Sequence, residues 1–383
     1  MTDSGVRLGE KRRLRLDYNL IVLIILVAFI GIVTIMQVTT ITPGRFPTMI
    51  APANLTNVLA QVSATGIMAM GMAMVMIGGG IDLSVGMLTS FVVLHLAKSF
   101  IDPLYGQRLP LIVAILLSIA FAVLLETGMG WIISRFKVEP FIITLGGMIC
   151  FRGIALRIVN SQEVSMTIDG VQQLGDGGQF NLKASIMPDG IVDVAGLTVY
   201  FPIYIFVFIG ITVLVWVIMK YTKYGRRIYA VGANPHAAYL AGINVKNIIL
   251  STYTINGLLV GIASVFLLSR VNTAIISTGQ NKEIDVIAAA VIGGVALSGG
   301  KGSIWGVFVG AILMGAIENG LTIMRQKAEM QYVAKGLIII GAVVVGSIIE
   351  TMVSRNQMRQ KRQEIEAISD AAAEVADEAS GAE

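Results

Sequence analysis

The sequence predicts an all-α, polytopic integral membrane protein with about ten transmembrane helices, some of them discontinuous at glycines. Of its 383 residues, 55% are hydrophobic and only 14% are charged, whereas soluble domains carry roughly 25% charged residues. The mean hydropathy of +0.79 agrees with this class. Two apolar runs also break at glycine pairs. Because lipid satisfies no free backbone groups, such breaks must lie against protein or water.

The first apolar run follows a basic amino-terminal segment. Residues 1–18 carry five basic side chains and precede an uncharged run at residues 19–38. This run has about the 20 residues that a span requires, and it lacks the small-residue cleavage site of a signal peptide. We therefore expect a retained first helix. Hydropathy places further spans at residues 55–76, 83–98, 111–134, 141–159, 202–219, 248–269, 286–297, 304–323 and 333–349.

Loop charges predict the orientation of these spans, because Lys and Arg collect in short cytoplasmic loops. With both termini in the cytoplasm, most basic loop residues fall inside; Arg325 and Lys327 are exceptions. The residues inside are Arg135, Lys137, Lys220, Lys223, Arg226, Arg227, Arg355, Arg359, Lys361 and Arg362. The transmembrane domain then covers residues 19–350, with an acidic external loop at 160–198, a cytoplasmic loop at 220–247 and an acidic cytoplasmic tail at 351–383.

The most informative stretch is MIGGGIDLSVGMLTS, at residues 76–90. Its pattern GGxxLSxG recurs at residues 293–300, and paired glycine breaks in two halves of a membrane chain point to a transport path. We predict path or gating roles for Gly79, Gly80, Asp82 and Ser84, with a positive φ angle at Gly80. An alternative for Asp82 is an acidic group near a helix start, where the helix dipole stabilises it.

Other polar residues of the spans have a second interpretation. Glu318 and Asn319, late in the ninth span, are candidate path residues, although hydrogen bonding between helices is the commoner role. Glu126, near a cytoplasmic end, is expected to be structural. The single cysteine and the two distant histidines argue against a disulfide framework or a metal centre.

The sequence contains no complete nucleotide-binding motif. SGGKGS, at residues 298–303, fails the pattern GxxxxGK[ST] at two positions, Val295 and Gly302. No catalytic motif appears elsewhere. We expect neither an enzyme nor a bound cofactor in this chain, and any ATP and Mg²⁺ would be bound by a partner.

The cytoplasmic loop contains YGRRIYAVGANPHAAYLAGINV, at residues 224–245, which predicts one short helix. Asn234 suits the amino-terminal cap, Pro235 the first helical position, and Gly242 the left-handed residue that ends the helix. Small side chains at Ala237, Ala238 and Ala241 favour close packing against a partner. The alternative is a helix lying on the membrane surface.

Four stretches together resemble the permease subunits of bacterial ABC importers for monosaccharides, the group that includes ribose, xylose and galactose permeases. They are GGGIDLSVG (78–86), TLGGMICFRG (144–153), YAVGANPHAAYLAGINV (229–245) and EIDVIAAAVIGGVALSGGKGSIWG (283–306). The resemblance implies a pore of two identical or related permease chains in the inner membrane. It also implies a cytoplasmic ATPase pair that engages residues 234–242 and an extracytoplasmic sugar-binding protein.

On this basis we predict a permease that moves a monosaccharide by alternating access, driven by a separate ATPase. An ion- or proton-coupled secondary transporter also uses broken helices and is the main alternative. A purely structural membrane subunit is a more distant alternative. The sugar itself is not identified by sequence.

Overall fold

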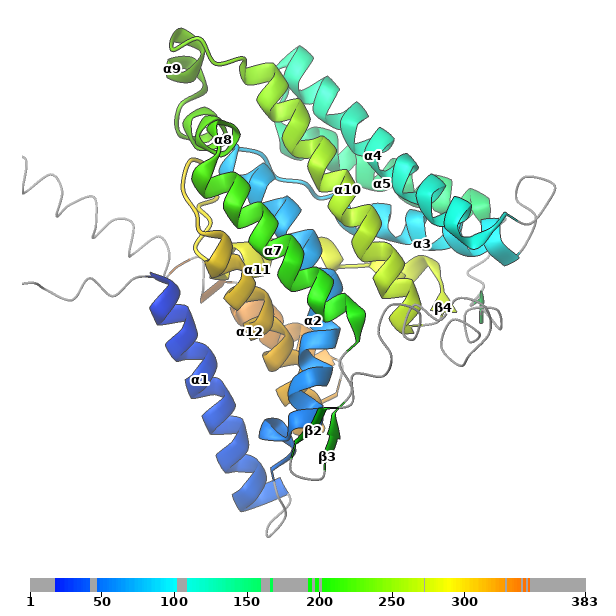
Figure 1. The fold of residues 1–383 in the computed structure, drawn as a ribbon, viewed down its shortest axis with the longest axis vertical. Helices are drawn as coiled ribbons and strands as arrows, with labels where there is room; N and C mark the ends of the chain where they lie inside the picture. The colour runs from blue at the N-terminus through cyan, green and yellow to red at the C-terminus, as the bar shows by residue number, and fades with distance from the viewer. Residues whose placement is uncertain are drawn as a thin grey trace, which may run out of the picture. The chain divides into compact units, whose positions relative to one another are not determined.

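The computed structural model describes residues 18–41, 47–101, 109–159, 166–167, 192–194, 197–199, 202–271, 273–327, 329–338, 340–341 and 344. The chain divides into two units after Arg325. The described part of the first unit is helical apart from two short antiparallel strand pairs (Figure 1). The external loop, the acidic tail and the basic segment before Tyr18 lie almost entirely outside the described residues.

The long helices of the first unit match most of the predicted spans. Their bounds are α1 (Tyr18–Met36), α2 (Pro52–Ile77), α3 (Val85–Ile101), α4 (Leu111–Phe136), α5 (Pro140–Ile158), α7 (Ile203–Tyr221), α10 (Val245–Val271) and α12 (Ile304–Ile323). A π-helical turn at Gln37–Ile41 extends α1, and a 3-10 turn at Thr48–Ile50 precedes α2. Each helix ends near the polar or glycine residue that bounds its apolar run.

Shorter elements connect these helices. They are α8 (Lys223–Ala233), α9 (Pro235–Leu240), a 3-10 turn at Ile276–Gly279 and α11 (Lys282–Ile292). Strand β1 (Met166–Thr167) pairs antiparallel with β4 (Thr273–Ala274), and β2 (Val192–Val194) pairs with β3 (Leu197–Val199). The registers join Met166 to Ala274 and Val192 to Val199.

Within the described residues, seven helices are long and apolar enough to cross a membrane. Helix α3 is apolar but shorter, and the predicted span at 286–297 forms helix only as far as Ile292. The eleven residues of α11 rise roughly 16 Å, about half of a bilayer core. The tenth run is helical at 333–338 and continues partly outside the described residues. The count of about ten therefore stays a prediction, whereas the discontinuous segment at α11 is observed.

Helix α2 forms the core of the first unit. It packs against α7, α10, α11 and α12, which surround it in Figure 1. Its apolar window is 83% buried, compared with 17% for α5. Glycines make the close approaches possible, because a Cβ at Gly66 would collide with Phe208 of α7 and one at Gly315 with Val62 of α2. The exposed apolar faces of α1, α4 and α5 are those that lipid or another protein covers.

Candidate functional site

The first glycine break ends α2. The amide of Gly80 donates to the carbonyl of Val75 at 2.9 Å, and that of Gly79 donates to Met76 at 2.9 Å. Gly79 has a φ of 89°, a conformation that costs L-residues with a side chain roughly 1–2 kcal/mol. Our prediction of a positive φ at Gly80 is therefore wrong by one residue. At Gly80 the constraint is space, because a Cβ there would lie 2.8 Å from the Tyr253 hydroxyl.

The second break ends α11 with the same geometry. Gly294 has a φ of 85°, its amide donates to Val291 at 2.9 Å, and the amide of Val295 donates to Ala290 at 3.0 Å. The same backbone turn therefore occurs at both breaks, but one residue apart in the pattern GGxxLSxG, because the left-handed residue is its first glycine at Gly79 and its second at Gly294. The turns differ in chemistry, since Leu297, three residues after Gly294, stands where the first turn has Asp82.

These two segments meet each other and the end of α8. We call the contact of Gly79, Gly232, Gly299 and Gly300 the glycine junction. The amide of Gly300 donates to the carbonyl of Ile77 at 2.8 Å. A Cβ at Gly299 would lie 2.9 Å from Gly79 Cα, and one at Gly232 would collide with the Ile77 carbonyl. Only residues without side chains allow three backbone segments to approach this closely.

A tyrosine of α8 adds a hydrogen bond to the junction. The Tyr229 hydroxyl donates to the carbonyl of Gly302 at 3.0 Å. Burial raises the pKa of the Tyr229 phenol above its usual value, so the hydroxyl stays a neutral donor. Helix α8 is therefore fastened to the second glycine segment by both backbone packing and a side chain.

Beside the first turn lies a group of polar side chains that we call the carboxyl cluster: Asp82, Ser84, Glu126 and Asn256. Asp82 Oδ1 accepts the Ser84 amide at 2.9 Å and the Ser84 hydroxyl at 2.7 Å. Asp82 Oδ2 accepts the Asn256 amide at 2.7 Å. The Ser84 hydroxyl also lies 3.0 Å from Glu126 Oε1. All four residues are fully buried.

The cluster joins the turn to α4 through Glu126 and to α10 through Asn256. A third contact comes from α5, where Thr144 Oγ1 donates to the carbonyl of Ile81 at 3.2 Å. Asp82 and Ser84 are thus buried and hydrogen-bonded within the cluster in this conformation, and their path or gating role stays a prediction. Sequence reasoning predicted Asp82 and Ser84 as site residues but missed Asn256, because an Asn in a long apolar helix is not distinctive on its own.

The remaining predicted path residues lie elsewhere. Asn319 and Asn54 exchange two amide hydrogen bonds, of 2.9 and 3.1 Å, between α12 and α2. Glu318, half-buried, is adjacent. Asn54 begins α2 and Gly79 follows its end, which separates them by roughly 35 Å of helical rise. The structure therefore does not bring Glu318 and Asn319 together with Gly79, Gly80, Asp82 and Ser84.

The predicted short helix in the cytoplasmic loop is α9. Asn234 Oδ1 accepts the amide of Ala237 at 2.9 Å, Pro235 is the first helical residue, and Gly242 has a φ of 79°. These three expectations are confirmed. Sequence reasoning missed α8. The residue that could have indicated its start is the cap Thr222, whose hydroxyl oxygen accepts the Gly225 amide at 3.1 Å.

The small side chains predicted to form the packing face of α9 are only partly accessible. Ala237 and Ala241 are exposed, but Ala238 is 4% exposed and packs inside the chain. Tyr239 and Leu240 are instead 69% and 73% exposed. The side chains that α9 presents outward are therefore larger and more apolar than expected.

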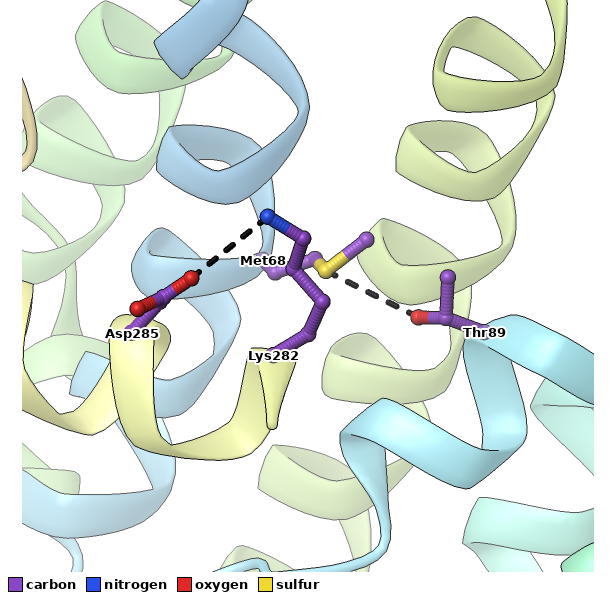
Figure 2. Close-up of polar contacts among 4 residues, drawn as sticks. All are labelled: Met68, Thr89, Lys282 and Asp285. Atoms are coloured by element: carbon purple, nitrogen blue, oxygen red, sulfur yellow. Dashed lines mark hydrogen bonds and ion pairs between the residues drawn. The ribbon is translucent and has the colours of Figure 1, made fainter. Parts of the chain in front are cut away.

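Charged residues also begin α11, where the side chains of Lys282 and Asp285 are partly buried. Figure 2 shows Lys282 Nζ at 3.5 Å from Asp285 Oδ2, one helical turn apart, with Met68 of α2 and Thr89 of α3 nearby. Thr89 Oγ1 contacts Met68 Sδ at 3.7 Å. Because charges in apolar surroundings are costly, their pairing reduces the penalty of placing them on this half-length helix. Among the residues that the structure describes, no group of His, Cys, Asp and Glu suits a metal ion.

Comparison with known proteins gives consistent matches over most of the chain. A family described as branched-chain amino acid transport system / permease component matches residues 54–343. A xylose transport system permease protein of Haemophilus influenzae is 34% identical over 367 residues, covering 85% of this chain and 96% of that protein. Its counterpart in Escherichia coli K12 is 34% identical over 372 residues, covering 86% and 92%. A ribose import permease protein of Bacillus subtilis is 33% identical over 304 residues, covering 78% and 86%. No solved structure matches significantly.

Proposed function

This chain belongs to the family of permease components of branched-chain amino acid transport systems, and from that premise we propose that it imports a monosaccharide as the transmembrane subunit of an ATP-driven importer. Relatives named for xylose and ribose cover most of both chains, which favours a sugar over an amino acid. The observation that carries the proposal is this match together with the repeated glycine turn at both breaks. Paired interrupted helices are a feature of transport paths.

The proposed assembly needs further subunits. A cytoplasmic ATPase pair binds ATP and Mg²⁺, a second permease chain completes the pore, and an extracytoplasmic binding protein delivers the sugar. The incomplete phosphate-loop pattern at residues 298–303 supports a separate ATPase. Exposed apolar faces on α4 and α5 leave room for a second permease chain.

We place the glycine junction on the cytoplasmic side of a bacterial inner membrane, with both termini also inside. The basic residues Lys220, Arg226 and Arg227 lie in or next to α8, at the same end of α7 and α10 as α9 (Figure 1). Positive charge in short loops favours the cytoplasmic side. Helix α9 then faces the compartment that contains the ATPase.

In this arrangement α9 and α8 couple the ATPase to the turn. The α9 cap residue Asn234 follows Gly232 by two residues, so a displacement of α9 acts directly on the glycine junction. The junction contacts the end of α2 and includes Gly299 and Gly300, which follow the second turn, and the first turn continues into the carboxyl cluster. Movement of one short helix thereby reaches both glycine breaks without passing through the long spans.

Reconstitution tests the proposal directly. Vesicles containing the permease and its ATPase are expected to accumulate xylose or ribose only with the binding protein outside and ATP inside. Vesicles with the permease alone and a proton or sodium gradient are expected to show no uptake. Gradient-driven uptake without the ATPase would establish the secondary-transporter alternative instead.

A substitution on α9 tests the docking role. Leu240→Glu places a charge on the most exposed apolar side chain of α9. We expect the amount of ATPase that co-purifies with the permease to fall at least tenfold, because an apolar interface anchor contributes about 1.4 kcal/mol or more. Ile35→Glu, 64% exposed near the end of α1 that the loop charges place outside, is the matched control and should retain the ATPase. Full retention in Leu240→Glu would instead support the membrane-surface role for α9.

A further inference from the structure

The carboxyl cluster contains a hydrogen-bond pattern that two ionised carboxylates cannot make. The Ser84 hydroxyl lies 2.7 Å from Asp82 Oδ1 and 3.0 Å from Glu126 Oε1. A hydroxyl has one hydrogen and donates to only one of these acceptors. Because an ionised carboxylate has no hydrogen to donate, hydrogen bonds from Ser84 to both carboxyls require an additional proton in the cluster.

The charges around the cluster lead to the same requirement. Asp82 and Glu126 are both fully buried, and the described residues bring no Lys, Arg or His into hydrogen-bond or ion-pair distance of either carboxyl. The hydrogen-bond partners of the two carboxyls are neutral: Ser84 on the turn and Asn256 of α10. The nearby Tyr253 hydroxyl donates instead to the Ile81 carbonyl at 3.5 Å. Two adjacent negative charges without a counter-ion are strongly disfavoured in such surroundings.

The hydrogen bonds also indicate which carboxyl carries the proton. The two oxygens of Asp82 receive three donors, from the Ser84 amide, the Ser84 hydroxyl and the Asn256 amide, which suits the ionised form. Among the described residues Glu126 hydrogen-bonds only Ser84, and its Oε2 has no hydrogen-bond partner. A protonated Glu126 donates and therefore completes the pattern.

We propose that the Asp82–Glu126 pair is a proton-binding site, which holds one proton on Glu126 and one negative charge on Asp82. The proton lets Glu126 on α4 donate to Ser84 on the turn, so it links the first glycine break to the neighbouring helix. Loss of the proton leaves two ionised carboxylates that repel each other, and it weakens the link between the first glycine break and α4. The proposal rests on the geometry of the cluster and is independent of the transported solute.

Infrared spectroscopy of the purified permease complex in lipid nanodiscs tests the proposal at neutral pH. The wild type is expected to show a carboxylic-acid C=O absorption that disappears in Glu126→Gln. Glu329→Gln removes an exposed carboxylate and should leave that absorption unchanged. Glu126→Gln should also keep a melting temperature close to that of the wild type, because the amide NH₂ replaces the acid O–H as a donor.

A wild-type spectrum without a carboxylic-acid absorption at neutral pH would overturn the proposal, as would an absorption that persists in a folded Glu126→Gln variant. If that variant does not fold, the wild type with ¹³C-labelled glutamate takes its place. The absorption is then expected to shift, and an unshifted absorption would contradict its assignment to a glutamate. A melting temperature that rises with Na⁺ concentration, without an acid absorption, would show that a cation occupies the cluster instead.

Discussion

The variant Asp82→Ala is expected to lose transport and to be destabilised by about 3 kcal/mol, because it leaves the Ser84 amide, the Ser84 hydroxyl and the Asn256 amide without their acceptor in a buried site. The measurement is the melting temperature of the purified protein, together with sugar uptake. A melting temperature equal to that of the wild type would show that the cluster does not hold the turn.

Asp82→Asn separates the charge from the geometry. The Oδ1 atom of Asn256 has no hydrogen-bond partner, so a flip of the Asn256 amide can present this oxygen to the new NH₂ group. We therefore expect Asp82→Asn to retain more of its stability than Asp82→Ala. Loss of uptake in a stable Asp82→Asn variant would assign a transport role to the charge itself.

Gly232→Ala is expected to abolish transport while the ATPase still co-purifies. The added Cβ would collide with the carbonyl of Ile77 and lie 2.6 Å from the Gly300 nitrogen, and both are backbone atoms that cannot rotate away. Overpacking of this kind costs about 1–3 kcal/mol, which the junction relieves by moving α8 away from α2. Since α9 keeps its sequence and exposed side chains, the ATPase should stay bound.

The matched control is Gly210→Ala on α7, where an added Cβ meets nothing within 4 Å. This control should transport normally. Stimulation of ATP hydrolysis by the binding protein is the second measurement, because a coupling role predicts its loss in Gly232→Ala and a merely structural role does not. Normal uptake and stimulation in Gly232→Ala would exclude the junction as the route between α9 and the turns.

Local patterns predicted the elements of this protein well where local physics decides them. The α9 cap at Asn234, the proline at its first position and the left-handed Gly242 depend on backbone groups within a few residues. The two glycine breaks likewise formed the same turn, although one residue apart in the GGxxLSxG pattern. The error of one residue between Gly80 and Gly79 arose because three consecutive glycines satisfy the same conformational requirement equally well.

The predictions that failed or were missing concern contacts between distant parts of the chain. Ala238 was expected to face a partner, but α9 turns it inward, and a six-residue helix has too few residues to show a face in its pattern. Gly232 and Asn256 were not distinguished from other residues of their segments, and the structural role expected for Glu126 stays a prediction. Each acquires its role only from a neighbour in space.

The sequence by itself determined the membrane class, most of the long helices and the two glycine breaks. Burial in lipid requires long apolar runs, and a helix break requires particular residues at the position of the break. Only the tertiary structure decided what surrounds the breaks. Glu126 lies 42 residues from Ser84, and Asn256 lies 174 residues from Asp82, yet each pair is within hydrogen-bond distance. Such pairings depend on how helices pack, and that packing is selected by the whole set of buried contacts rather than by any one stretch of chain.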